Sequence, residues 1–126
     1  MTRFLWICLG GAAGTGARYL MSGWVQRLGG TFPYGTLAVN VLGSFLLGVI
    51  MRVALTTELL SPTPRLALTV GVLGGFTTYS TFNYETLQYF QDGAWLFAFL
   101  NILTTVLGCL IAGALGLFTA RWAIGS

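Results

Sequence analysis

The chain has 126 residues, of which 56% are hydrophobic and 7% are charged. Soluble domains carry about 25% charged residues, so the composition excludes a soluble enzyme and predicts an integral membrane protein whose main partner is the lipid bilayer. Six arginines and three acidic residues give a net charge of +3, and the chain contains no histidine. Because phosphate recognition needs clustered basic residues, we expect no nucleic-acid partner. We expect no enzymatic activity.

Hydropathy predicts an all-α protein with four membrane-spanning helices in a single transmembrane domain that covers residues 1–126. A spanning helix needs about 20 apolar residues. Polar breaks separate four such segments, at about residues 4–24, 35–55, 65–90 and 94–122. Backbone groups in hydrocarbon must be satisfied internally, so long segments without alternating polarity are helices rather than barrel strands.

Small residues recur four positions apart in several of these segments. The motifs are Gly10-xxx-Gly14, Ser44-xxx-Gly48, Gly71-xxx-Gly75 and Gly108-xxx-Ala112-xxx-Gly116. Such spacing lets helix backbones approach closely in a membrane. The motifs predict either contacts between subunits or ordinary packing within one chain. Because thin, glycine-rich helices enclose little on their own, we expect a homo-oligomer.

The arginines are unevenly distributed between the two predicted sides of the membrane. Four spans place both termini and the 58–64 loop on one side, together with Arg3, Arg52, Arg65 and Arg121. The other side has Arg27 and, depending on its depth, Arg18. The positive-inside rule favours cytoplasmic termini. The difference is small, and insertion in both orientations stays open.

The third segment predicts a broken helix. Gly74 and Gly75 are adjacent, and five of the next six residues carry hydroxyl groups. Glycine lowers helix propensity, and Ser and Thr offer the backbone alternative partners. A break centred on residues 74–78 would expose carbonyl oxygens to cations and a half-helix N-terminus to anions. The alternative is a continuous, glycine-lined packing helix.

Polar and aromatic side chains inside the apolar segments are the candidate functional residues. Asn40, with Thr36 one turn earlier, either lines a permeation path or forms an interhelical hydrogen bond, and Asn101, Thr104 and Thr105 leave the same alternatives. Arg18 either pairs with Glu85 across helices or extends to the lipid headgroups. Glu85 is a candidate proton-coupling carboxylate, but its position near a helix end favours a structural hydrogen bond or ion pair. Ring edges are electropositive, so the aromatic run either packs or holds a small anion; it comprises Phe76, Tyr79, Phe82 and Tyr84.

Taken in order, these residues resemble the Fluc-type fluoride channels of the CrcB family. The resemblance rests on residues 10–14 with 16–19, residues 35–37 with Val39 and Asn40, and residues 74–82 with Glu85. It implies a passive, fluoride-selective channel that lets fluoride leave a bacterial cytoplasm through the plasma (inner) membrane. It also implies an antiparallel, dual-topology homodimer with two pathways along the subunit interface.

The resemblance also implies roles for individual residues. A central structural sodium ion would be held by the backbone carbonyls of Gly74 and Thr77, and Arg18 and Gly75 would be structural. The side chains implied for the fluoride pathway are Thr36, Asn40, Tyr79, Ser80, Thr81, Phe82, Glu85 and Thr105. The chain departs from the family pattern at Tyr79, where relatives have the first of two phenylalanines, and at Cys109, where relatives often have serine.

Two other functional classes compete with the channel. A small multidrug exporter also has four spans, but it needs a carboxylate in its first helix for proton exchange, and residues 4–24 contain neither Asp nor Glu. A non-transporting assembly subunit would use the small-residue motifs alone.

Overall fold

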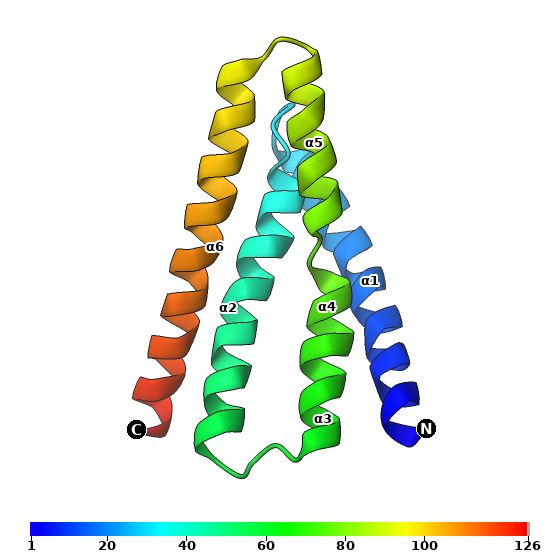
Figure 1. Ribbon diagram of the computed structural model, residues 1–126, viewed down its shortest axis with the longest axis vertical. Helices are drawn as coiled ribbons and strands as arrows, with labels where there is room; N and C mark the ends of the chain where they lie inside the picture. Colours follow the sequence, from blue (N-terminus) through cyan, green and yellow to red (C-terminus); the bar gives the residue numbers. More distant parts are fainter. Residues whose placement is uncertain (126) are drawn as a thin grey trace.

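The computed structural model describes residues 1–125, and they form helices joined by short loops (Figure 1). Three helices are long and continuous: α1 (Thr2–Leu28), α2 (Tyr34–Thr56) and α6 (Trp95–Ile124). The segment between α2 and α6 is divided into α3 (Pro62–Leu66), the π-helical η1 (Ala67–Leu73), α4 (Gly74–Phe76) and α5 (Tyr79–Gln91). The all-α prediction is confirmed over the described residues, and so is an interruption in the third segment.

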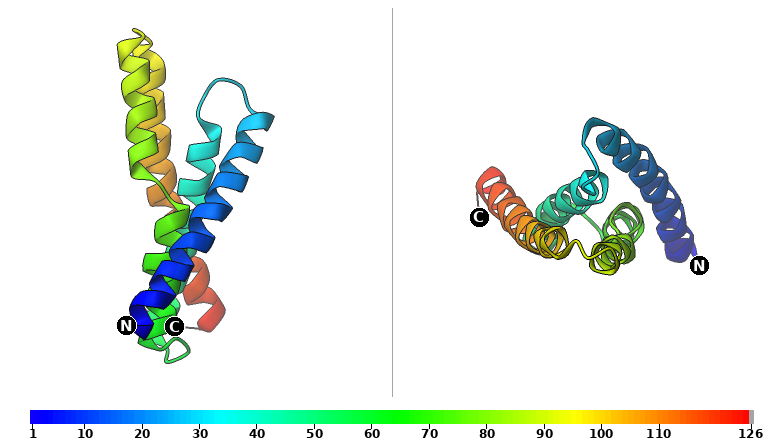
Figure 2. Two further views of the ribbon diagram at one scale, coloured as in Figure 1. Left: turned by 90° about the vertical axis from the view of Figure 1, so that its right-hand side faces the viewer. Right: turned by 90° about the horizontal axis from the view of Figure 1, so that it is seen from above.

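Helix α2 lies between the other elements. It packs along α6 on one side, while α1 packs against η1 and α4 on the other. Helix α5 pairs with the beginning of α6, and Figure 2 shows this hairpin rising away from α1. The hairpin turns at Gly93, whose φ of 75° is a left-handed conformation that favours glycine. Helix α5 therefore depends mainly on α6 for its position.

The small-residue motifs are used for contacts within the chain. A Cβ atom added at Gly75 would lie 2.6 Å from the carbonyl oxygen of Gly11, and one at Gly71 would lie 2.7 Å from that of Ile7. In the same way, a Cβ at Gly48 of α2 would lie 2.5 Å from the carbonyl oxygen of Gly113 in α6. Of the two interpretations open from the sequence, packing within one chain therefore accounts for these motifs. They supply no separate argument for an oligomer.

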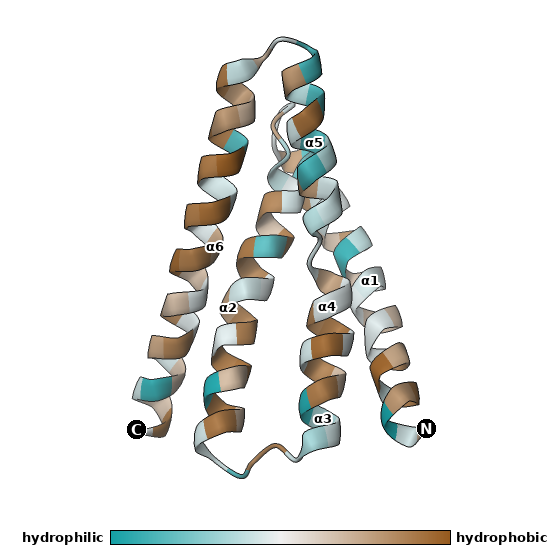
Figure 3. Ribbon diagram, in the orientation of Figure 1, coloured by the Kyte–Doolittle hydropathy of each residue, from teal (hydrophilic) through white to brown (hydrophobic). Residues whose placement is uncertain are grey.

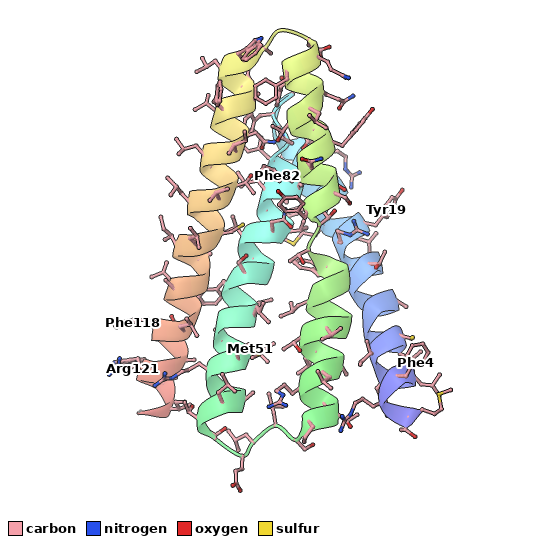
Figure 4. All side chains as sticks on the ribbon, in the orientation of Figure 1. Phe4, Tyr19, Met51, Phe82, Phe118 and Arg121 are labelled. Atoms are coloured by element: carbon pink, nitrogen blue, oxygen red, sulfur yellow. The ribbon has the colours of Figure 1, made fainter. Side chains whose placement is uncertain are left out.

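Large apolar side chains cover the outside of the molecule. Figure 3 shows apolar residues along the length of α2 and α6, and Figure 4 shows Phe4 and Phe118 pointing away from the other helices. Among the described residues, α2 and α6 are long and apolar enough to cross a membrane. Helix α1 has sufficient length at 27 residues, but glycines and three arginines reduce its hydropathy. The third segment is divided into pieces shorter than a span. The count of four spans therefore stays a prediction.

The break lies at the C-terminal end of the predicted range. Gly74 and Gly75 remain helical in α4, and the chain is extended at Thr77 (φ −90°, ψ 159°) and Thr78 (φ −149°, ψ 117°). The contact of Gly75 with α1 explains why glycines that favour a break are nevertheless helical, since this contact requires a residue without a side chain. The π-helical turn of η1 was not predicted from the sequence.

Candidate functional site

Asn40 of α2 holds the interrupted backbone of the third segment. Its Nδ2 atom donates a hydrogen bond to the carbonyl oxygen of Thr78 at 2.9 Å, and the Thr78 N–H donates to its Oδ1 atom at 2.7 Å. The Asn40 side chain is buried, with 8% of its surface exposed. The Asn40 carboxamide thus replaces both helical hydrogen-bond partners of Thr78, the acceptor of its N–H and the donor to its carbonyl. One Nδ2 hydrogen remains for another acceptor.

The same hydrogen bonds release carbonyl groups. In a continuous helix, the Gly74 carbonyl would accept from the Thr78 N–H, and the Thr77 carbonyl would accept from the Thr81 N–H. Here the Thr78 N–H donates to Asn40, and the Thr81 N–H donates to the Thr78 hydroxyl oxygen at 3.3 Å. The two carbonyls that the sequence resemblance assigns to sodium have therefore both lost their helical donors. This observation fits a cation held by backbone oxygens.

On the other side of the break, α5 begins with free donors. Thr78 caps this helix, because its hydroxyl oxygen accepts from the Thr81 N–H. The N–H groups of Tyr79 and Ser80, in the first turn, have no intrahelical acceptor. The positive end of the 13-residue helix α5 therefore lies at the break. The break thus places carbonyl oxygens without helical donors and N–H groups without helical acceptors within a few residues of one another.

Two hollows meet at Thr78. The first has a volume of about 270 Å³, and both Thr78 and Asn40 line it. It also contains Gly74, Thr77, Tyr79 and Cys109. The second has a volume of about 200 Å³, and its lining includes Thr78 together with Thr15, Arg18, Ser22, Thr36 and Thr81. The clamp between Asn40 and Thr78 therefore borders the first hollow through both residues and the second through Thr78.

The second hollow combines hydroxyl groups with one positive charge. Arg18 lines it from α1, and the Nε atom of this arginine is buried without a hydrogen-bond partner. Glu85 lies elsewhere, in a third hollow of about 280 Å³, and its Oε1 atom is also buried without a partner. The Glu85 carboxyl interacts instead with the hydroxyl of Thr36. An interhelical Arg18–Glu85 pair through these two atoms is therefore not formed.

Tyr79 and Phe82 form an edge-to-face pair next to the break. Their ring centroids are 5.7 Å apart, with an angle of 69° between the planes. Tyr79 has 77% of its surface exposed, whereas Phe82 has 7% exposed. In Figure 4 the Phe82 side chain lies near the break, where α5 passes α2. The two aromatic positions thus have different environments in one chain, since one faces outward and the other is enclosed.

The remaining sequence-predicted positions lie apart from the two hollows. Ser80 is exposed, and Thr105 is buried on α6. The sequence interpretation did not single out Thr78, whose backbone is the centre of the arrangement, or Thr86 of α5. Thr78 had a detectable signal, because threonine is a preferred N-cap residue just before the start of a helix. No local pattern indicates Thr86, whose partner lies on α6.

The sequence matches a known protein family and several named relatives. Residues 5–117 match the family model described as CrcB-like protein, Camphor Resistance (CrcB). A protein of Sorangium cellulosum (strain So ce56), named fluoride-specific ion channel FluC, is 60% identical over 122 residues, which cover 96% of each chain.

Two further relatives carry the same name. The protein of Anaeromyxobacter sp. (strain K) is 52% identical over 126 residues, which cover 99% of this chain and 100% of the relative. The protein of Geobacter sulfurreducens is 52% identical over 122 residues, which cover 96% of this chain and 98% of the relative. The similarity thus extends over nearly the full length of both chains.

Proposed function

The chain belongs to the CrcB family, and from this membership we propose that it is a fluoride-selective ion channel through which fluoride leaves a bacterial cytoplasm. It is a membrane protein and not an enzyme. The physical need for such a pore is simple. Hydrogen fluoride is neutral and crosses lipid, whereas the fluoride ion formed inside is charged and cannot return through hydrocarbon at an acceptable free-energy cost.

The observation that carries the proposal is the pattern of redirected hydrogen bonds at residues 77–78. A small anion needs donors that replace its hydration shell, and it must be bound weakly enough to leave. The N–H groups at the start of α5, the second Nδ2 hydrogen of Asn40 and the hydroxyl of Thr81 are such donors. Thr36 lies in the same hollow as Thr81, and its hydroxyl donates to the Glu85 carboxyl. The electropositive ring edges of Tyr79 and Phe82 adjoin them. Ser80, Glu85 and Thr105 complete the pathway in this proposal.

The proposed assembly has four spans per subunit, in two antiparallel copies in the plasma membrane. Helix α1 supports this, because 27 residues extend about 40 Å at about 1.5 Å per residue, enough to cross hydrocarbon about 30 Å thick. The exposed ring of Tyr79 and the exposed Gly74, which both line the first hollow, support a partner there. Each pathway would then lie along the interface between the two copies.

A structural sodium ion fits the residues at the break. The Gly74 and Thr77 carbonyls are both without their helical donors, and both residues line the first hollow. A hard cation prefers such oxygen ligands. Two copies related by a twofold axis would supply four carbonyls. When bound, the ion would supply a fixed positive charge that offsets the clustered carbonyl dipoles.

Flux measurements in liposomes test the proposal. Purified protein is reconstituted into vesicles loaded with potassium fluoride or potassium chloride, and efflux is started with a potassium ionophore. We expect fast fluoride efflux and little chloride efflux, with protein-free vesicles as the control. Equal efflux of both anions, or no efflux of either, would refute a fluoride-selective channel.

The sodium site is tested separately in the same vesicles. Replacing sodium by a large organic cation throughout purification should reduce fluoride efflux and lower the thermal stability of the protein. Unchanged efflux and stability in sodium-free conditions would contradict the proposed ion while leaving the channel itself intact.

A further inference from the structure

A buried hydrogen-bond chain links α6 to the backbone of α5. The Nδ2 atom of Asn101 donates to the hydroxyl oxygen of Thr86 at 2.9 Å, and the Thr86 hydroxyl donates to the carbonyl oxygen of Phe82 at 2.8 Å. Asn101 has 1% of its surface exposed, and Thr86 has 6%. This hydrogen-bond chain runs in one direction, from Asn101 to Phe82, because the Thr86 hydroxyl has a single proton and donates it to the Phe82 carbonyl.

This arrangement differs from the other threonine contacts of the molecule. The hydroxyls of Thr56 and Thr104 also donate to carbonyls four residues earlier in their own helices. Thr86 additionally receives a donor from a different helix. A threonine that bonds back to its own helix adjusts the local bend of that helix. Because Asn101 of α6 also donates to this hydroxyl, the local bend of α5 depends on the position of α6.

The position of α5 makes the link important. Figure 2 shows that α5 rises with the beginning of α6, away from α1. The start of α5 is held to α2 through Asn40 and Thr78. One turn beyond Phe82, Asn101 holds the same helix to α6. Two attachments at different heights fix the rotation of a helix about its axis, which a single attachment at one end does not.

The burial of Asn101 has a cost that apolar packing at this position would avoid. A buried carboxamide loses its hydrogen bonds to water, and each lost bond without replacement is worth a few kcal/mol. Buried polar groups can specify one arrangement among several that apolar packing would allow. Here the buried Asn101 specifies which face of α5 turns inward, namely the face that carries Phe82 and Thr86.

We propose that Asn101 is a positioning residue for the fluoride pathway: through Thr86 it sets the rotation of α5 and thereby the place of the Phe82 ring. The inference rests on the proposed channel function and names a residue that acts on the pathway without lining it. Phe82 and Tyr79 both lie on α5, so their edge-to-face pair turns with this helix as one unit. A change in that rotation alters the contact of the ring edge with a passing anion.

Four variants test the proposal by single-channel recording in planar bilayers, because unitary conductance does not depend on how much protein folds. Asn101→Leu and Thr86→Val each remove one member of the chain with little change in shape, and the double variant removes both. The control is Thr56→Val, which removes a hydroxyl that donates to the Arg52 carbonyl of its own helix. We expect the single variants to lower unitary fluoride conductance by about five- to tenfold, which corresponds to a permeation barrier higher by about 1 to 1.4 kcal/mol. Thr56→Val should conduct as wild type.

The double variant separates positioning from stability. Replacing both partners by apolar groups of similar shape is nearly neutral for stability, so its melting temperature should return toward wild type. Its conductance should stay as low as that of the single variants, because the directional link is still missing. Recovery of conductance together with stability would show a merely structural role and overturn the proposal. Wild-type conductance in the single variants would overturn it as well. If either single variant cannot be purified, the double variant carries the comparison.

A measurement that does not depend on conduction completes the test. Phe82 is replaced by its para-fluoro analogue, and its ¹⁹F resonance is recorded in the wild-type background and in each variant. Displacement or broadening of the resonance in Asn101→Leu and Thr86→Val, but not in Thr56→Val, supports positioning. An unmoved resonance overturns it. If the wild-type protein does not conduct, the proposed function fails, and the ¹⁹F spectra still decide the positioning role.

Discussion

Replacement of Asn40 by alanine tests the central contact of the structure. The change removes both hydrogen bonds to Thr78, at 2.9 and 2.7 Å, from a site that is nearly closed to solvent. Each bond contributes roughly 1 kcal/mol net, and stranding a buried N–H or carbonyl adds about 1–3 kcal/mol. The Thr78 N–H can partly recover by donating to the Gly74 carbonyl. We therefore expect Asn40→Ala to lower the free energy of unfolding by about 2–4 kcal/mol.

Asn40→Ala is also expected to reduce fluoride efflux by the protein that remains folded. If the Thr78 N–H returns to Gly74, the break shortens and one of the two free carbonyls is consumed. Fluoride efflux per folded protein should then fall by at least about tenfold, which corresponds to a barrier higher by roughly 1.4 kcal/mol. Efflux from liposomes is compared with the fraction of folded protein measured by gel filtration.

A matched carboxamide on α5 provides the control for this experiment. Asn83 is exposed, so Asn83→Ala should change the free energy of unfolding by less than about 0.5 kcal/mol. Unfolding is followed by titration with sodium dodecyl sulfate, using helical circular dichroism as the signal. If Asn40→Ala is as stable as Asn83→Ala and conducts like wild type, the clamp between α2 and the break does not hold the site together.

Two further predictions concern the aromatic pair and the helix contacts. Tyr79→Phe should retain or increase fluoride efflux and should change stability by less than about 0.5 kcal/mol, because the residue is exposed; abolished efflux would show that the hydroxyl is essential. Gly75→Ala should cost about 1–3 kcal/mol in the same titration, since its Cβ would lie 2.6 Å from the Gly11 carbonyl oxygen. Gly16→Ala, whose Cβ would meet no atom of another helix within 4 Å, should be neutral or stabilising by up to about 1 kcal/mol. Equal stability of the two glycine variants would contradict the close contact between α1 and α4.

Hydropathy and spacing predicted much of the fold because these signals are local. The apolar segments coincide with helices, and the hydroxyl-rich run after Gly75 predicted an interruption. The place of the interruption was shifted because glycine has two opposed effects. Its low helix propensity favours a break at Gly75, but its small size allows the contact with Gly11 that keeps α4 helical. The contact is a tertiary effect, which local propensity does not contain.

The sequence predicted most residues of the candidate site, but it did not predict which of them form hydrogen bonds with one another. Asn40 was recognised as a polar residue in an apolar segment, with a pathway role and an interhelical bond both open. The structure shows the hydrogen bonds, to a backbone 38 residues later in the chain. Asn101 was ambiguous in the same way, and its partner Thr86 was missed. Sequence alone assigns a polar side chain to the membrane interior, whereas its partner depends on how the helices cross.

The clamp between Asn40 and Thr78 also has a consequence for the order of synthesis. Helix α2 leaves the ribosome before the third segment, so the Asn40 carboxamide is already in the membrane when Thr78 arrives. An extended dipeptide is costly in hydrocarbon until its N–H and carbonyl groups find partners. We therefore expect the third segment to complete its insertion against a preceding helix rather than alone. Asn40 is then an acceptor and donor for the newly made chain before it has any role toward an ion.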